Sequence, residues 1–388
     1  MSASIDLSQK PLVVLWEATE ACDLACVHCR ACAQPRRSPQ ELTTEQARKF
    51  IDDVAALRPP IFILTGGDPL KRHDIYHLVE HAASLGLRPA MAPSVTPLLT
   101  RTAVGELKNV GLARLALSLD GSAPHPHDSF RGVPGSYFRT LEVMRWANEA
   151  RLPLQVNTCI TRRNLRDLDH LVAVLQQFKV VLWSVFLLVP VAHRSLADLP
   201  TAEECEQVFA HLYRLSRQVP FKIKTTEAQH YRRFIMQNRP QRAERSPVQT
   251  RGWREGEEND AVHAGRWMTE GAEHGVPGLL PINDGKGFIF VSHSGEVFPS
   301  GFLPISAGNV KAQSLTQIYR ESPLLLSLRD TANLKGKCRE CEFKEVCGGS
   351  RARAYAVTGD LFAEDPCCAY QPLKRGAQPR RGVLLKMA

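Results

Sequence analysis

Most of the chemistry that this sequence could perform resides in its eleven cysteines. All but Cys159 and Cys205 fall into two groups, one near each end of the chain. The front group is Cys22, Cys26, Cys29 and Cys32, and the back group is Cys338, Cys341, Cys347, Cys367 and Cys368. We see no secretion signal, and thiols stay reduced in the cytosol. Clustered thiols therefore indicate a metal site rather than a disulfide framework.

The front group has the spacing Cys22-x3-Cys26-x2-Cys29 and follows a short apolar stretch. Three thiolates on one loop can hold three irons of a cubane cluster, whereas the usual electron-transfer cluster takes four cysteines. The fourth iron is then free to bind another molecule, as a catalytic cluster requires. We interpret Cys32 as a spare thiol, because a third tight spacing would strain the loop. Structural zinc, which prefers four tetrahedral ligands, is the alternative, with His28 as a poorly placed ligand.

Three further segments follow strand-like stretches and carry a family resemblance together with the cysteines. They are Gly66-Gly67-Asp68-Pro69, Ser118-Leu119-Asp120-Gly121 and Asn157-Thr158. The set spans roughly residues 11–190 and resembles the radical S-adenosylmethionine (radical SAM) superfamily. Asp68 stands where that family more usually has the longer glutamate.

The resemblance implies that one [4Fe–4S] cluster binds S-adenosylmethionine through its free iron. Reductive cleavage of the sulfonium would then give a 5′-deoxyadenosyl radical that takes a hydrogen atom from the substrate. By the same resemblance, His28 would lie beside the adenine, and the turn at 66–69 would meet the methionine amino group. Ser118, Asp120 and Asn157 would meet the carboxylate or the ribose. Paired glycines suit such a site, since they let backbone approach a ligand closely.

The back group reads Cys338-x2-Cys341-x5-Cys347 and then Cys367-Cys368. Four thiolates saturate a [4Fe–4S] cluster, and the segment resembles the auxiliary-cluster extension called SPASM, or Twitch when shortened. The resemblance selects Cys368 as the fourth ligand, with Cys367 as the alternative. It implies one auxiliary cluster only, because Ser300 stands where a second would need cysteine. Zinc is again the alternative.

The elements that must position these residues alternate along the first half of the chain. Strand-like stretches lie at 12–16, 61–65, 88–94, 113–119, 152–161 and 180–189, and helical patterns at 44–57, 73–85, 101–108, 136–150, 165–178 and 202–218. This alternation predicts parallel β/α units whose sites lie at the carboxyl ends of the strands. We therefore expect an α/β protein, a partial (β/α)6 TIM-type barrel with a small C-terminal α+β iron–sulfur domain.

The expected domains follow from these patterns. Residues 11–220 form the radical SAM barrel, and 221–284 form a helix and a polar connecting segment. Residues 285–372 form the auxiliary-cluster domain, with a hairpin at 287–299 and a helix at 315–329, and a basic tail covers 373–388.

The overall charge and composition limit the kinds of partner that this protein can bind. The net charge is +9, but the basic residues are scattered and only 7% of residues are aromatic, which argues against nucleic-acid binding. No run of about 18 apolar residues indicates a membrane span. We expect a cytoplasmic enzyme that acts on a small molecule and takes electrons from a one-electron donor such as ferredoxin or flavodoxin.

The nearest likeness is to enzymes that remove side chains from iron tetrapyrroles in haem biosynthesis. It rests on the segment Cys-Gly-Gly-Ser-Arg-Ala-Arg-Ala at 347–354. Arg351 and Arg353 are candidates for pairing with substrate carboxylates, since guanidinium groups suit them; helix-surface charge is the alternative. Two other functions remain open: a maturase of ribosomal peptides or proteins, and a non-catalytic iron–sulfur or zinc protein.

Overall fold

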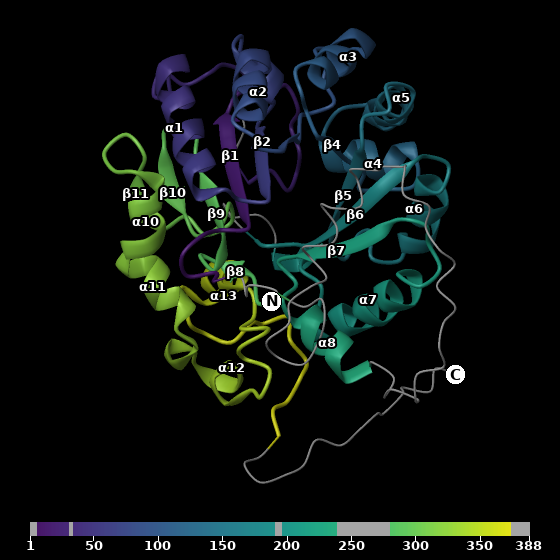
Figure 1. The fold of residues 1–388 in the computed structure, drawn as a ribbon. Coiled ribbons are helices and arrows are strands. Elements are labelled where there is room, and N and C mark those ends of the chain that lie inside the picture. Colours follow the sequence, from purple (N-terminus) through teal and green to yellow (C-terminus); the bar gives the residue numbers. More distant parts are fainter. Residues whose placement is uncertain (1–5, 31–33, 191–195, 239–279, 374–388) are drawn as a thin grey trace, which may run out of the picture.

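The computed structural model describes residues 6–30, 34–190, 196–238 and 280–373. Its centre is a curved sheet in which seven parallel strands follow one another in chain order (Figure 1). They are β1 (Val13–Thr19), β2 (Ile61–Gly66), β3 (Pro89–Met91), β4 (Arg114–Ser118), β5 (Leu154–Ile160), β6 (Val180–Leu187) and β7 (Lys222–Thr226). The expected partial barrel is confirmed.

Helices alternate with these strands, and most of them cover the outer face of the sheet (Figure 1). They are α1 (Thr44–Leu57), α2 (Ile75–Ser84), α3 (Arg101–Asn109), α4 (Pro124–Arg131), α5 (Ser136–Glu149), α6 (Leu168–Leu175), α7 (Ala202–Leu215) and α8 (His230–Asn238). Helix α1 shows why they form: Thr43 and Gln46 make a reciprocal capping box, and Phe50, Ile51 and Val54 are buried against the sheet. Trp16 of β1 meets Phe50 edge to face, with ring centroids 5.4 Å apart.

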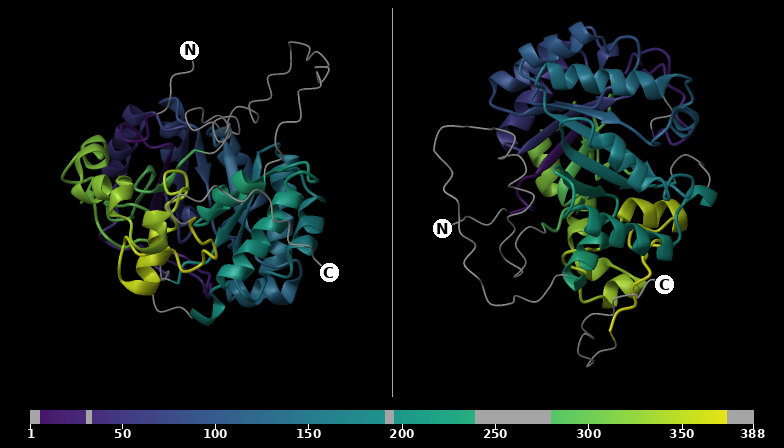
Figure 2. Two further views of the ribbon diagram at one scale, coloured as in Figure 1. Left: turned by 90° about the horizontal axis from the view of Figure 1, so that it is seen from below. Right: turned by 90° about the vertical axis from the view of Figure 1, so that its right-hand side faces the viewer.

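The C-terminal segment continues the barrel's sheet instead of forming a separate one. It contains β8 (Asn283–Asp284), β9 (Gly287–Val291), β10 (Glu296–Phe298), β11 (Gly308–Asn309), α10 (Leu315–Glu321), α11 (Pro323–Arg329), α12 (Gly336–Glu340) and α13 (Arg351–Thr358). Strand β9 pairs parallel to β1, so it satisfies an edge that would otherwise be open. The hairpin expected at 287–299 is present as β9 and β10. Figure 1 and the right-hand view of Figure 2 place α12 and α13 below the sheet, away from α2 and α3.

Three elements differ from expectation. Strand β7 lies in a segment expected to hold only a helix and a connection, and it pairs parallel to β6. Helix α4 was not expected. The single helix expected at 315–329 is two helices, because Pro323 lacks the N–H that would continue α10. Most of the polar connection and of the basic tail lies outside the described residues.

No helix in the described part of the chain combines the length and the apolar character needed to cross a membrane.

Candidate functional site

The front cysteine site consists of Cys22, Cys26 and Cys29, on the loop that follows β1. Backbone hydrogen bonds close this loop, from Cys22 N to Gln34 O (2.7 Å) and from Gln34 N to Glu20 O (3.2 Å). All three cysteines line one cavity of about 240 Å³ at the carboxyl ends of the strands. Other sequence-predicted residues on its wall are His28, Gly66, Gly67, Ser118, Asp120 and Asn157. Cys32 lies outside the described residues.

Two glycines hold the end of β2 tightly against the cysteine loop. A Cβ on Gly66 would lie 2.2 Å from Thr19 O, and one on Gly67 would lie 2.3 Å from Ala21 O. The amide of Gly67 donates to Thr19 O at 2.8 Å, and the amide of Asp68 donates to Ala21 O at 2.7 Å. Only glycine fits so close to this backbone. The pair therefore fixes the loop that carries Cys22, besides lining the cavity.

Asp68 and Pro69 do not line this cavity in the structure. The Asp68 side chain is buried, caps the short 3-10 helix at Pro69–Lys71 by accepting from Leu70 N, and accepts from Thr96 Oγ1 at 2.7 Å. Burial raises the pKa of Asp68 to about 6. The geometry gives the Asp68 side chain a role in shaping the turn, and the expected contact of the 66–69 turn with the methionine amino group stays a prediction.

Two side chains set the surroundings of the cysteines. The Ser94 hydroxyl donates to Gly67 O at 2.7 Å and lies 3.1 Å from Cys22 Sγ. The ring of His28 stacks on Phe130, with centroids 4.2 Å apart and an interplanar angle of 29°. Ser94 was missed by sequence reasoning, although its position after the third strand was a usable signal.

Arg131 of α4 is a second residue that sequence reasoning missed. Its guanidinium pairs with Asp120 and also points to Cys26 Sγ at 3.7 Å. The other oxygen of Asp120 accepts from the amide of Cys159 at 2.7 Å. Both oxygens of Asp120 are therefore engaged, and the carboxylate positions a cation beside the thiols. Because α4 was not expected, the sequence offered no element on which to place Arg131.

The remaining predicted residues of the front site lie on neighbouring strands. Ser118 of β4 and Asn157 of β5 are register partners, so they face the cavity side by side. Asn157 Oδ1 accepts from Gln155 Nε2 at 2.7 Å. Cys159 also lines the cavity, and burial raises the pKa of its thiol far above the usual range.

The chemistry of the front site fits a metal cluster. Burial raises the pKa values of Cys22 and Cys26, so these thiols need a metal to hold them as thiolates at neutral pH. Among the described residues, no three His, Cys, Asp or Glu side chains gather closely enough to hold a single ion. The sulfurs instead surround a cavity.

The back cysteine site consists of Cys338, Cys341, Cys347 and Cys368, which line a second, smaller cavity. The segment that carries Cys347 is tied to residues in β8 and next to β7. The side-chain Nδ2 of Asn283, in β8, donates to Cys347 O at 3.2 Å, and the side chain of Glu227, just after β7, accepts from Ser350 Oγ. Burial raises the pKa of Cys347 to about 12 and that of Cys341 to about 11. These thiols too are suited to metal.

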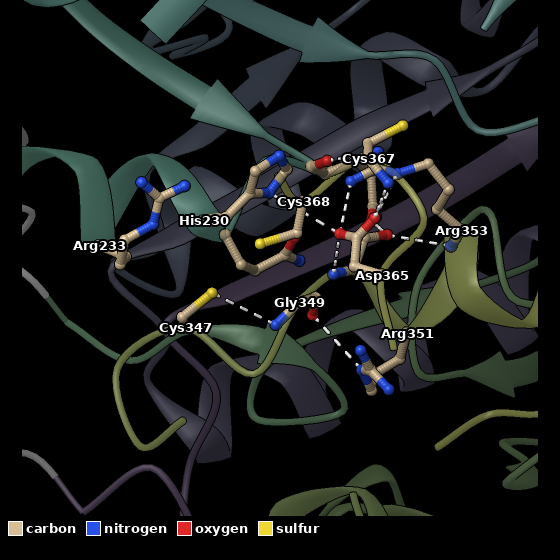
Figure 3. Close-up of polar contacts among 12 residues, drawn as sticks. His230, Arg233, Cys347, Gly349, Arg351, Arg353, Asp365, Cys367 and Cys368 are labelled. Carbon is tan, nitrogen blue, oxygen red and sulfur yellow. Dashed lines mark hydrogen bonds and ion pairs between the residues drawn. The ribbon is translucent and has the colours of Figure 1, made fainter. Parts of the chain in front are cut away.

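Cys367 and Cys368 are adjacent in the sequence, but their side chains point to different surroundings. Cys368 lines the cavity with the other three, whereas the sulfur of Cys367 points to Pro200 O at 3.4 Å and lies beside Cys205. Figure 3 shows the two sulfurs on opposite sides of the chain, with that of Cys368 directed toward Cys347. The geometry favours Cys368 as the fourth thiol.

The roles expected of Arg351 and Arg353 are wrong. Both side chains are buried, at 1% and 0% exposure, so neither is helix-surface charge nor free to meet a substrate. Arg353 forms a two-point ion pair with Asp365 (Figure 3). It also donates to Glu227 O, and Arg351 donates to Leu361 O and Ala363 O. Burial would raise the pKa of Asp365, but Arg353 and the other donors hold it well below its usual range. The two arginines fold the loop that carries Cys368.

Comparisons with known proteins agree with this architecture. The model of the radical SAM superfamily matches residues 16–175. The AdoMet-dependent heme synthase of Methanosarcina barkeri is 36% identical over 371 residues, which cover 96% of this chain and 100% of that protein. The protein of the same name from Nitratidesulfovibrio vulgaris is 35% identical over 362 residues, which cover 93% and 92%.

Solved structures share the fold at low identity. Streptococcus suis SuiB bound to S-adenosylmethionine has a TM-score of 0.66 and 15% identity, covering 93% of this chain and 78% of that one. The peptide-bound and AdoMet-bound anSMEcpe has a TM-score of 0.64 and 13% identity, covering 92% and 94%. The family match and the full-length relatives together establish the assignment. This chain belongs to the radical SAM superfamily, whose enzymes use a [4Fe–4S] cluster and S-adenosylmethionine.

Proposed function

We propose that this enzyme acts in haem synthesis, on an iron tetrapyrrole whose acidic side chains it modifies. The observation that carries this proposal is the sequence identity of 35–36% to proteins named AdoMet-dependent heme synthase along nearly the whole chain. More distant relatives are named Fe-coproporphyrin III synthase, at 28% identity, and pre-heme d1 synthase, at 26%. All three names refer to iron tetrapyrroles or their precursors. Relatives named PqqA peptide cyclase are also more distant, at 27–28%.

The names suggest a specific reaction. Iron coproporphyrin III carries propionates at two positions where haem carries vinyl groups, so it is a reasonable substrate for a haem synthase. Turning one propionate into a vinyl releases carbon dioxide and removes one hydrogen atom and one electron from the side chain. The hydrogen atom requires a radical acceptor and the electron requires a one-electron acceptor. A radical SAM enzyme is suited to this chemistry.

In this proposal Cys22, Cys26 and Cys29 hold the catalytic cluster. When bound, the cluster and S-adenosylmethionine supply a carbon radical that can take a hydrogen atom from an unactivated carbon. Gly66 and Gly67 keep the cysteine loop against β2 and present backbone to the cofactor. His28, Ser118 and Asn157 line its pocket, and the Arg131–Asp120 pair places positive charge beside Cys26. The support for these roles is that all of these residues share one cavity.

The wall of that cavity also suits a large apolar ring. Leu187, Leu188 and Val189, at the end of β6, and Phe302 line it beside the polar residues. Apolar side chains around a few polar groups are typical of cofactor-sized ligands. We infer that these residues pack against the macrocycle and exclude water from the reacting carbon.

We propose further that Cys338, Cys341, Cys347 and Cys368 hold one auxiliary [4Fe–4S] cluster. Support comes from the four thiols around one cavity and from the positive charge nearby, since Arg233 and Lys337 line the same cavity. Such charge offsets thiolates in a buried site. A small one-electron donor such as ferredoxin or flavodoxin would supply the front site.

The test is anaerobic reconstitution with iron and sulfide, followed by incubation with S-adenosylmethionine, a one-electron reductant and iron coproporphyrin III. We expect 5′-deoxyadenosine to appear in step with loss of carbon dioxide from the tetrapyrrole, and neither product from the Cys22→Ala variant. Deoxyadenosine formation without any change in this or another porphyrinoid would rule out the tetrapyrrole function. Zinc in place of iron and sulfide would rule out radical chemistry altogether.

A further inference from the structure

Two cations, Lys224 and Arg114, face the inside of the barrel, and no acidic side chain in the described part of the chain acts on either of them. Lys224 of β7 is the register partner of Ser184 in β6, and Ser184 is in turn the partner of Asn157 in β5. Register partners in a parallel sheet point to the same face. Lys224 therefore projects to the face on which Asn157 lines the cofactor cavity. This explains why β7, which reads Lys-Ile-Lys-Thr-Thr, lacks the apolar pattern of a buried strand.

Two arginines accompany this lysine. Arg114 of β4 lies four residues before Ser118 and so faces inward as well. Its Nη1 donates to Gln155 Oε1 at 3.4 Å, and Gln155 bonds to Asn157. Arg232 of α8 donates to the carbonyls of Leu280 and Ile282, at 2.8 and 2.6 Å.

These contacts run continuously from one cysteine site toward the other. From the cofactor cavity they pass through Asn157 and Gln155 to Arg114, while Lys224 interacts electrostatically with both Arg114 and Arg232. Arg232 in turn interacts with Cys347 of the back site. The basic set thus lies between the two places where iron is expected.

Among the described residues, the charges of Lys224 and Arg114 have no acidic counterpart, whereas Asp284 and Cys347 act on Arg232. Both charged groups that act on the Lys224 ammonium are cations, Arg114 and Arg232, and the charged group acting on Arg114 is Arg88. Burial and these two cations lower the pKa of Lys224 to about 8. Burial also lowers the pKa of Arg232 to about 10, although Cys347 and Asp284 act in the opposite direction. Buried charge is costly unless it is paired. Lys224 also keeps partial solvent exposure.

We propose that Arg114, Lys224 and Arg232 form a carboxylate-binding subsite inside the barrel, which holds propionates of the substrate. The subsite rests on the proposed tetrapyrrole function and assigns residues to it. By fixing carboxylates that do not react, it orients the ring so that one side chain faces the cofactor cavity. These three residues thus have the role in binding substrate carboxylates that the sequence analysis expected of Arg351 and Arg353.

The test compares the affinity of the reconstituted protein for iron coproporphyrin III and for its tetramethyl ester, by absorption titration. The variants are Lys224→Met and Arg114→Met, with Lys49→Met on the exposed face of α1 as the matched control. Loss of one charge-assisted hydrogen bond should raise the Kd for the free acid about tenfold or more. Affinity for the ester, affinity for S-adenosylmethionine and iron content should stay unchanged, and Lys224→Arg should restore binding.

The outcomes separate the two claims. If the wild-type protein binds the free acid and both variants bind it equally well, the subsite is wrong and the tetrapyrrole function stands. If the wild-type protein binds neither compound, the tetrapyrrole function fails, and the subsite fails with it. A variant that loses iron or S-adenosylmethionine binding together with the free acid would also count against the subsite, since its effect would be on folding.

Discussion

Arg353 and Asp365 form a two-point ion pair with no solvent exposure, with Nε–Oδ1 at 2.9 Å and Nη2–Oδ2 at 2.7 Å. Arg353 belongs to α13, just after Cys347, and Asp365 lies three residues before Cys368. Asp365 also accepts from the amides of Ser350 and Cys367. The pair therefore fixes the distance between two thiols of the back site.

Arg353→Met should destabilise the protein and empty the back site of iron. Removing one partner of a buried pair leaves an uncompensated charge, at a cost of about 3–5 kcal/mol. The control is Lys335→Met, which breaks the exposed ion pair with Asp360 in the same segment. Denaturant unfolding and iron content check both variants. If Arg353→Met and Lys335→Met had the same stability and the same iron content, the buried ion pair would not be what holds the loop.

Cys368→Ala should halve the iron content after reconstitution, whereas Cys367→Ala should leave it unchanged. The reason is that only Cys368 shares a cavity with Cys338, Cys341 and Cys347, while Cys367 lies beside Cys205. Cys368→Ala should still cleave S-adenosylmethionine, because the front site is intact. The opposite pattern of iron loss would assign the ligand to Cys367.

Gly67→Ala should disrupt the front site through the backbone. The new Cβ would lie 2.3 Å from Ala21 O, so the loop that carries Cys22 must move. Gly105→Ala in α3 is the matched control, because its Cβ meets nothing within 4 Å and alanine favours a helix. We expect Gly67→Ala alone to lose 5′-deoxyadenosine formation. A fully active Gly67→Ala would contradict the close approach.

Binding of the free-acid tetrapyrrole should weaken as pH rises above about 8. Burial, with Arg114 and Arg232 nearby, lowers the pKa of Lys224 to about 8, so its ammonium is charged below that pH and neutral above it. Arg232, with a pKa of about 10, keeps its charge over the start of this range. Titrations from about pH 7 to about pH 9.5 check the trend. In Lys224→Arg the decline should disappear, and a decline of the same size there would assign it to another group.

Local patterns made the barrel and the front site predictable. The strands are apolar, α1 begins and ends where its capping and spacing indicate, and the cysteines share one short loop. The burial of Arg353 was not predictable, since its partners Asp365 and Glu227 lie 12 and 126 residues away. Strand β7 escaped notice because its inward face is basic rather than apolar. Long-range pairing and a polar barrel interior leave no periodic signal.

Transfer of deuterium tests the central claim most directly. Iron coproporphyrin III with deuterated propionates is incubated anaerobically with the reconstituted protein, S-adenosylmethionine and reductant, and both products are analysed by mass spectrometry. We predict deuterium in 5′-deoxyadenosine, matched by conversion of propionate to vinyl. Deoxyadenosine without deuterium, beside an unaltered tetrapyrrole, would contradict the account.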